Sequence, residues 1–353
     1  MQVGLFRLVA VYVLVLLAGA IHTLESKFCD LCTKALLVSL ICLFGIVLRV
    51  EFEAVVDGVA NDGNLLVWYK KLPQDFYSAA SQENSRTLES FLLTQKPKPP
   101  VKLAEIQTPA VSAKSYVVMD VVSGTVLSEK NPDEVFPPAS TAKIATALAA
   151  LALYDLDEEI AIPQFCTQVD GNKIGFGQGL RFRVEAILQA LLVASAGDAA
   201  CTLSVSRVSY ADFVAKMNFV VKEGGLARTK FTNPIGLDDA DGENLSSARD
   251  LAKLAILAMH NDFFRETVKL KELELRDLDG KFAKQLTNTN RLLWDIPESV
   301  GIKTGTTTGA GEVLVYEYTK DKADLIIVAM GSKDRFADVK LLLDWTLLSH
   351  SWE

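Results

Sequence analysis

The segment Phe136-Pro-Pro-Ala-Ser-Thr-Ala-Lys143, followed by Ile144-Ala-Thr-Ala-Leu-Ala-Ala-Leu-Ala-Leu153, decides how this sequence folds. Its two prolines suit the approach to a helix, and the alanine- and leucine-rich stretch after them has high helix propensity. A helix that is apolar on all sides is usually buried in a core. The sequence therefore predicts a buried helix that starts near Ser140.

Ser140 and Lys143 are three positions apart at this helix start, so their side chains share one face. Burial disfavours a charged amine and lowers its pKa, so we expect Lys143 to accept protons near neutral pH. A serine beside such a base is an activated nucleophile. About one Ser-x-x-Lys is expected by chance in a chain of this size, so the pair alone leaves a catalytic serine and an ordinary helix start equally open.

A second segment, Val300-Gly-Ile-Lys303-Thr304-Gly305-Thr306, precedes two strand-like runs at 312–318 and 323–330. We expect Lys303-Thr304-Gly305 to lie on a strand that leads into this hairpin. Lysine and threonine offer a cation and a hydroxyl to a carboxylate, and glycine lets a substrate backbone approach closely. Alone, the segment is more often a solvated strand with a glycine kink, but its place after the serine-lysine helix favours binding.

A third segment lies between these two. A helical pattern at 185–194 is interrupted by Ser195-Ala196-Gly197-Asp198 and resumes at 199–207. We expect Asp198 to cap the second helix. A serine in such a break can point into a cleft and relay protons, although alone it is more often a turn residue.

The three segments, in this order, resemble the S-x-x-K, S-x-N and K-T-G motifs of the penicillin-binding and serine beta-lactamase superfamily. The sequence is most similar to the low-molecular-mass D-alanyl-D-alanine carboxypeptidases, from about Ala113 to the C-terminus. Further segments that resemble this family lie at 116–124, 231–238, 247–252 and 288–293. The resemblance implies a peptidoglycan stem peptide ending in D-Ala-D-Ala as substrate, beta-lactams as inhibitors, and no metal or cofactor.

The resemblance also implies a role for each matching residue. Ser140 would be the nucleophile that forms an acyl-enzyme, Lys143 would be its general base, and Ser195 would pass a proton to the departing D-alanine. The backbone N–H groups of Ser140 and Thr306 would form the oxyanion hole.

The third motif would bind the substrate. Lys303 and Thr304 would hold its terminal carboxylate, and Gly305 and Thr306 would lie beside its backbone.

The sequence departs from this family at Gly197, where the S-x-N motif has asparagine. The missing amide normally contacts the first-motif lysine and the substrate carbonyl, and its loss would cost about 10²–10³-fold in rate by analogy with an oxyanion-hole amide. Restoring it by Gly197→Asn is expected to raise the rate. Besides an active carboxypeptidase, a weakly active or non-catalytic peptidoglycan-sensing homologue and a beta-lactamase stay open. If the chain were a purely structural membrane protein, the occurrence of the three motifs in this order would be a coincidence.

Composition excludes other classes of function. Of the 353 residues, 50% are hydrophobic, and the net charge of −8 argues against nucleic-acid binding. The three histidines are scattered without metal-ligand spacing, so a zinc peptidase is not expected.

Two apolar runs near the N-terminus, 8–21 and 35–48, predict a pair of transmembrane helices. The alternatives are a cleaved signal peptide for the first and a buried helix for the second. Lys27 and Lys34, between the runs, place this linker in the cytoplasm and the enzyme outside. We therefore expect attachment to the lipid bilayer of the cell membrane, with an extracytoplasmic catalytic domain.

The five cysteines show no disulfide framework. Cys29 and Cys32 form a C-x-x-C pair without the second pair that a zinc site needs, and they are expected to be thiols. Cys42, Cys166 and Cys201 are expected to be apolar membrane or core residues.

The order of elements predicts an α+β domain in which an antiparallel sheet is covered by helices. The resemblance to beta-lactamases and transpeptidases implies in addition an all-helical subdomain. Strands are expected at 116–122 and 126–129, helices dominate 140–260, and strands return before a last helix at 336–348. The predicted organisation is a membrane anchor (1–50), a stalk (51–110) and a catalytic domain (111–353).

Overall fold

The computed structural model describes residues 98–103, 106–238 and 244–352, which belong to one compact unit that extends from residue 97 to 353. The predicted membrane segments and the Cys29–Cys32 pair fall outside the described residues. Within those ranges, no helix is both long and apolar enough to cross a bilayer. All three motif segments lie in this unit.

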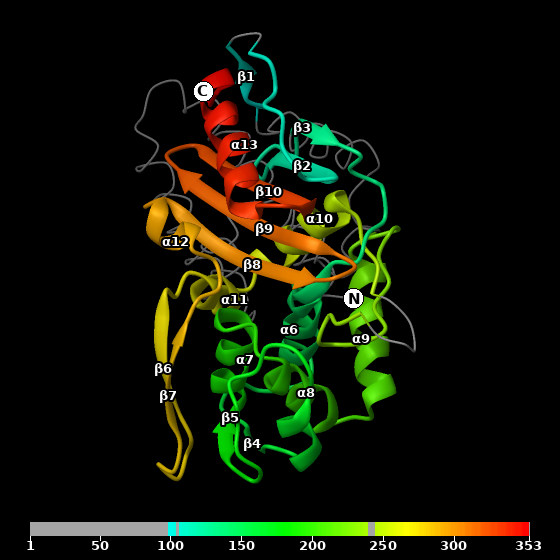
Figure 1. Ribbon diagram of the computed structural model, residues 1–353, viewed down its shortest axis with the longest axis vertical. Helices are drawn as coiled ribbons and strands as arrows, with labels where there is room; N and C mark the ends of the chain where they lie inside the picture. Colours follow the sequence, from blue (N-terminus) through cyan, green and yellow to red (C-terminus); the bar gives the residue numbers. More distant parts are fainter. Residues whose placement is uncertain (1–97, 104–105, 239–243, 353) are drawn as a thin grey trace, which may run out of the picture. The chain divides into compact units, whose positions relative to one another are not determined.

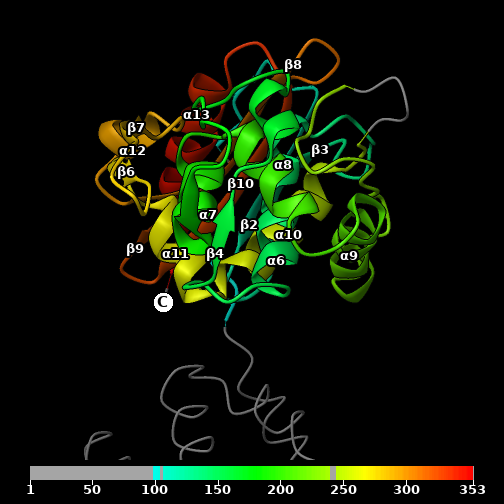
Figure 2. The ribbon, with the colours of Figure 1, turned by 90° about the horizontal axis from the view of Figure 1, so that it is seen from below.

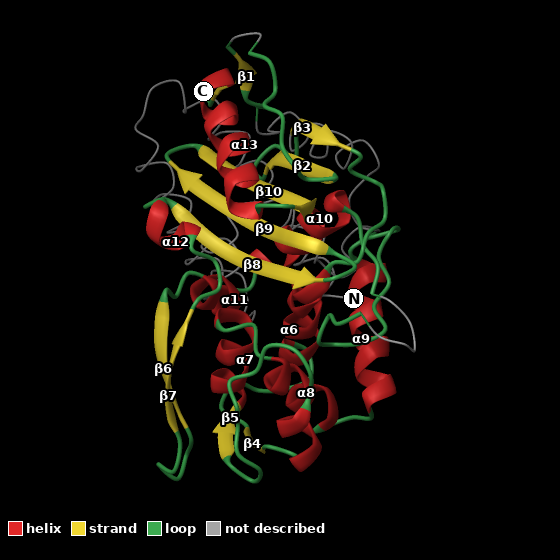
Figure 3. Ribbon diagram, viewed as in Figure 1, coloured by secondary structure: helices red, strands yellow, loops and turns green. Residues whose placement is uncertain are grey.

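A five-stranded antiparallel sheet forms the centre of this unit (Figure 3). The strand order is β3-β2-β10-β9-β8, so the first long strand pairs with the last, and β8 forms one edge. The strands predicted at both ends of the domain are therefore confirmed. Their bounds are β2 Ser115–Asp120, β3 Val126–Lys130, β8 Ser299–Thr307, β9 Gly311–Lys320 and β10 Ala323–Ser332.

Both faces of the sheet are covered, and successive residues of a strand point to opposite faces. On β9, Val313 and Val315 belong to the core cluster shared with the helical region, whereas Leu314 and Tyr316 pack with α13 (Arg335–Ser349). A strand that is buried on both faces is apolar at successive positions. Figure 1 shows α13 lying across β9 and β10.

The helical region lies against the other face of the sheet (Figure 2). Serine caps fix two of its helices: Ser209 accepts the N–H of Asp212, and Ser247 accepts the N–H of Asp250. The predicted α+β class, with helices between terminal strands, is confirmed. The helices here are α6 Lys143–Leu151, α7 Val184–Val193, α8 Gly197–Val205, α9 Tyr210–Glu223, α10 Ala248–Met259 and α11 Asp262–Val268, with the 3₁₀ turns η2 Ala139–Ala142 and η3 Gln164–Gln168, and α12 Leu292–Asp295 follows nearer the sheet.

Short strand pairs, which the sequence analysis did not predict, complete the described ranges. The hairpin of β6 and β7 is attached to the helical region by the rings of Phe176, Phe182 and Phe282, whose centroids lie 4.7–6.0 Å apart. The pairs are β1 Val101–Lys102 with β11 His350–Ser351, β4 Glu159–Ala161 with β5 Arg181–Arg183, and β6 Glu272–Arg276 with β7 Ala283–Thr287.

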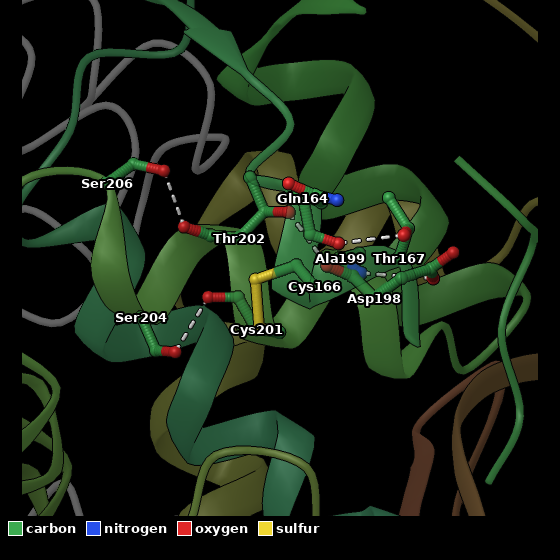
Figure 4. Close-up of a disulfide and its surroundings, with 9 residues drawn as sticks. All are labelled: Gln164, Cys166, Thr167, Asp198, Ala199, Cys201, Thr202, Ser204 and Ser206. Carbon is green, nitrogen blue, oxygen red and sulfur yellow. Dashed lines mark hydrogen bonds between the residues drawn. A yellow bond between two sulfur atoms is a disulfide. The ribbon is translucent and has the colours of Figure 1, made fainter. Parts of the chain in front are cut away.

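Cys166 and Cys201 form a disulfide, which corrects the expectation that both are unpaired core residues (Figure 4). The bond joins η3 to α8. Both cysteines are buried, as expected, but the pairing depends on how closely η3 approaches α8, with a Cα–Cα distance of 5.4 Å. Sequence spacing does not reveal that approach.

Candidate active site

Ser140 lies in η2, one turn before Lys143 begins α6. The preceding residue, Ala139, has a left-handed backbone (φ 49°), which is uncommon for a residue with a side chain. Gly236 lies so close to Ala139 that a Cβ at position 236 would overlap the Ala139 carbonyl oxygen. This tight backbone packing fixes the point where the chain turns into α6, and it leaves Ser140 half-buried.

Lys143 is 1% exposed, and its Nζ lies 2.9 Å from the Ser140 Oγ. The same amine donates a hydrogen bond of 2.6 Å to the carbonyl oxygen of Ile235. Burial lowers the pKa of Lys143 from 10.5 to about 7, and the negative charge of Asp198 opposes that shift. A large share of this amine is thus uncharged at neutral pH and can accept the Ser140 proton.

The edge strand β8 passes directly beside this pair. A Cβ on Gly305 would lie 2.9 Å from the backbone nitrogen of Ser140 and 3.0 Å from the Pro138 carbonyl oxygen. Glycine is therefore required at position 305 for β8 to reach the start of α6. This approach places Gly305 next to the Ser140 backbone nitrogen, one of the two groups that the resemblance assigns to the oxyanion hole.

Lys303 is the second buried lysine of the site, at 1% exposed. Its Nζ donates to the carbonyl oxygen of Thr304 at 3.1 Å. Burial, together with the positive charges of Lys143 and Arg335, lowers the pKa of Lys303 well below its usual value. A bound anion would offset these effects, so the site favours a negatively charged ligand.

Arg335, at the start of α13, is a site residue that the sequence analysis missed. Its Nη1 donates to the Gly305 carbonyl oxygen at 2.8 Å and to the Thr306 Oγ1 at 2.5 Å. Its side chain is only 15% exposed, and the Glu312 carboxylate lies 4.0 Å from its Nε. A guanidinium beside the third motif suits a carboxylate ligand. No motif marks Arg335, because only the packing of α13 on the sheet brings it to β8.

The two threonines of the third motif differ in exposure. Thr304 is buried, with its hydroxyl 2.6 Å from that of Thr289, whereas Thr306 is exposed. Thr306 thus offers a directly accessible hydroxyl beside Arg335.

Ser195 lies in the turn between α7 and α8, as predicted. It adopts a left-handed backbone (φ 57°) and is 5% exposed. Helix α8 packs against α6, and the charge of Asp198, in the first turn of α8, acts on the Lys143 amine.

The predicted role of Asp198 as a helix cap is confirmed only in part: its carboxylate accepts the N–H of Ala199 in the first turn of α8 at 3.1 Å, but Asp198 is not the N-cap residue, which is Ala196. Asp198 lies inside the first turn of α8, where its carboxylate accepts the backbone N–H groups of Ile174 (3.3 Å), Gly175 (2.9 Å) and Phe176 (3.2 Å). Backbone N–H groups of a distant loop compete successfully for this carboxylate because the loop folds over α8. Asp198 therefore fastens that loop to the second motif.

Gly197 packs against two neighbours. A Cβ there would lie 3.0 Å from the Asn172 carbonyl oxygen and 3.4 Å from the Ile235 Cγ2. These groups occupy space that an asparagine side chain would need. The Ile235 carbonyl accepts a hydrogen bond from the Lys143 amine. The resemblance assigns a contact with this lysine to the asparagine that Gly197 replaces.

The described residues hold no cluster of three or more histidine, cysteine or acidic side chains suited to a metal ion. What they bring together is a serine, a buried amine at hydrogen-bond distance, and two further basic side chains, Lys303 and Arg335, beside the same strand. On this fold, such a site defines a serine hydrolase of the penicillin-binding type.

The chain belongs to the D-alanyl-D-alanine carboxypeptidase family, peptidase family S11, whose profile matches residues 102–334. It is 30% identical to D-alanyl-D-alanine carboxypeptidase DacB2 of Mycobacterium tuberculosis, over 68% of this chain and 84% of the relative. It is 34% identical to DacC of Escherichia coli, over 68% of this chain but only 62% of the relative. The predicted family is therefore confirmed, and the chain is a serine-type hydrolase of this class.

Solved structures agree with the fold. A D-alanyl-D-alanine carboxypeptidase from Mycobacterium tuberculosis superposes with a TM-score of 0.65 and 28% identity, covering 70% of this chain and 95% of that one. The Streptomyces K15 DD-transpeptidase gives a TM-score of 0.64 at 28% identity, covering 68% of this chain and 98% of the other.

Proposed function

We propose that this protein removes the terminal D-alanine from peptidoglycan stem peptides through an acyl-enzyme on Ser140. The observation that carries the proposal is the Ser140–Lys143 pair, with 2.9 Å between the hydroxyl and the amine and a pKa of about 7 at Lys143. A serine in this state can attack an amide carbonyl at neutral pH.

In this mechanism Lys143 accepts the Ser140 proton as the Oγ bonds to the carbonyl carbon of the penultimate D-alanine. The backbone N–H groups of Ser140 and Thr306 stabilise the oxyanion. The proton then moves from Lys143 through Ser195 to the departing amine, and the C–N bond breaks. Water, activated by the same base, hydrolyses the ester and regenerates Ser140.

The basic side chains beside β8 would select a free C-terminal carboxylate. Arg335 supplies a guanidinium, Lys303 supplies an amine whose charged form a bound carboxylate would favour, and Thr304 and Thr306 supply hydroxyls on the strand that Gly305 brings close to Ser140. This arrangement explains why a carboxypeptidase would act only at a chain end, since an internal peptide bond has no carboxylate at this position.

Labelling the full chain with a fluorescent penicillin tests the nucleophile. We expect covalent labelling in the parent and none in Ser140→Ala. Release of D-alanine from a peptide ending in D-Ala-D-Ala, compared with the same peptide ending in D-Ala-L-Ala, tests the reaction. Labelling without release would favour the weakly active, ligand-sensing alternative that Gly197 suggests, and rapid hydrolysis of the penicillin would favour a beta-lactamase.

We further propose that the catalytic unit lies outside the cytoplasm and is attached to the membrane through residues 8–21 and 35–48. The Cys166–Cys201 disulfide supports this location, because disulfides persist in oxidising compartments. Protease added to intact spheroplasts should degrade the catalytic unit. Protection until the membrane is broken would contradict this topology.

A further inference from the structure

Asn172, in the loop between η3 and β5, bridges the turn that carries Ser195. Its side-chain Nδ2 donates to the Ala194 carbonyl oxygen at 2.5 Å. Its own carbonyl oxygen accepts the N–H of Gly197 at 2.7 Å. We propose that Asn172 is a positioning residue that holds Ser195 in place for proton transfer, an inference that rests on the proposed function.

The turn needs such support because two helices end there. The Ala190 carbonyl of α7 accepts the N–H groups of Ala194 and Ala196, both at 3.2 Å. Other carbonyls at the end of α7 and N–H groups at the start of α8 need partners outside their own helices. The residue before α8, Ala196, provides no side-chain cap. Asn172 satisfies one group on each helix, on either side of Ser195 in sequence. A serine with a left-handed backbone persists only where its surroundings hold it.

Gly197 makes this bridge possible. A Cβ at this position would lie 3.0 Å from the Asn172 carbonyl oxygen and 3.5 Å from that of Asp170. A side chain there would press the loop outward and lengthen the Gly197–Asn172 hydrogen bond. The residue that departs from the S-x-N pattern is therefore the one that admits Asn172.

The loop that carries Asn172 is fastened at several other points. The backbone N–H groups of residues 174–176 donate to the Asp198 carboxylate. The Lys284 amine donates to the Ile174 carbonyl oxygen at 2.5 Å. The disulfide ties the start of the same connection, at Cys166, to Cys201 on α8. Asn172 is itself exposed, so its side-chain bond contributes little to overall stability and acts mainly on the geometry of the turn.

The test compares Asn172→Asp, which keeps the side-chain shape but removes the donor, with the matched control Lys173→Ala. Lys173 is exposed on the same loop, and among the described residues its amine hydrogen-bonds to the loop carbonyl of Val169 alone. We expect Asn172→Asp to lower kcat for D-alanine release about tenfold with KM changed less than about twofold, because proton relay depends on position. Lys173→Ala should leave both unchanged.

A substrate with a thioester in place of the last amide separates positioning from general damage. A thiolate leaves without a proton from Ser195, so its kcat should fall less than about threefold in Asn172→Asp. An equal loss on both substrates, or no loss on either, would overturn the proposal.

Hydrogen exchange tests the bridge between Asn172 and the Ser195 turn even if the parent protein shows no turnover. The backbone amides of 194–199 should exchange faster in Asn172→Asp than in the parent and in Lys173→Ala. Unchanged exchange would overturn the proposed bridge. An inactive parent whose turn still loosens in this variant would refute the proposed function and leave the structural role of Asn172 standing.

Discussion

The two serines of the site are held in different ways. Ser140 is fixed from within the core, where Gly236 and Gly305 let backbone segments close around it. Ser195 is fixed from the surface, by an exposed loop that reaches over its turn through Asn172. The difference teaches that moving the backbone at Ser140 would disturb the core, whereas the turn that carries Ser195 can be altered while the fold is kept.

The largest expected effect comes from the core side of this comparison. Lys143→Met removes the amine but keeps a side chain of similar length, and it should slow acylation by penicillin at least about 10³-fold. Stopped-flow labelling measures this rate. Lys253→Met, on the exposed face of α10, is the matched control and should react like the parent. A Lys143→Met protein that acylates within tenfold of the parent would show that another group is the base.

The loop that holds the Ser195 turn is tested by removing the disulfide that ties its start to α8. Cys166→Ala combined with Cys201→Ala should lower the free energy of unfolding by about 2–4 kcal/mol, because the bond closes a long loop in the unfolded chain. Acylation of Ser140 should slow much less than in Lys143→Met. Denaturant unfolding measures the stability, and an unchanged midpoint would mean that the disulfide does not brace the loop over α8.

A smaller effect is expected at Gly197, and here the structure reverses the expectation from sequence. The sequence alone predicts that Gly197→Asn restores a missing amide and raises the rate. A Cβ added at position 197 would lie only 3.0 Å from the Asn172 carbonyl oxygen and would displace the loop. The structure therefore predicts that acylation falls by roughly three- to tenfold. Gly197→Ala, which adds only the Cβ, should show part of the same loss. A faster Gly197→Asn enzyme would break the proposed link between Gly197 and Asn172.

Much of the fold could be predicted because local signals agree with it. The region from 140 to 260 was predicted to be mainly helical, and α9 and α10 within it begin after Ser209 and Ser247, residues of a type that commonly caps helices and whose hydroxyls do so here. The strand that carries Lys303 was likewise recognisable from the hairpin after it.

The parts that sequence did not reveal depend on distant segments meeting. Arg335 joins the site only because α13 packs on the sheet, and Cys166 meets Cys201 only because η3 folds against α8. Asp198 is a residue type that commonly caps helices. Its carboxylate also binds the loop at 174–176, because that loop lies over α8. The position of Asn172 over the Ser195 turn has the same origin.

The most direct test of the account is the pH dependence of acylation in the full chain. A neutral Lys143 amine is the active form, and its fraction increases with pH, so the rate constant should rise about tenfold per pH unit below a midpoint near 7 and level off above it. Lys143→Met should show no such rise in its residual rate. A parent profile that is flat between about pH 5 and 8, or that rises only near the ordinary lysine pKa of about 10.4, would contradict the role of Lys143 as the base for Ser140.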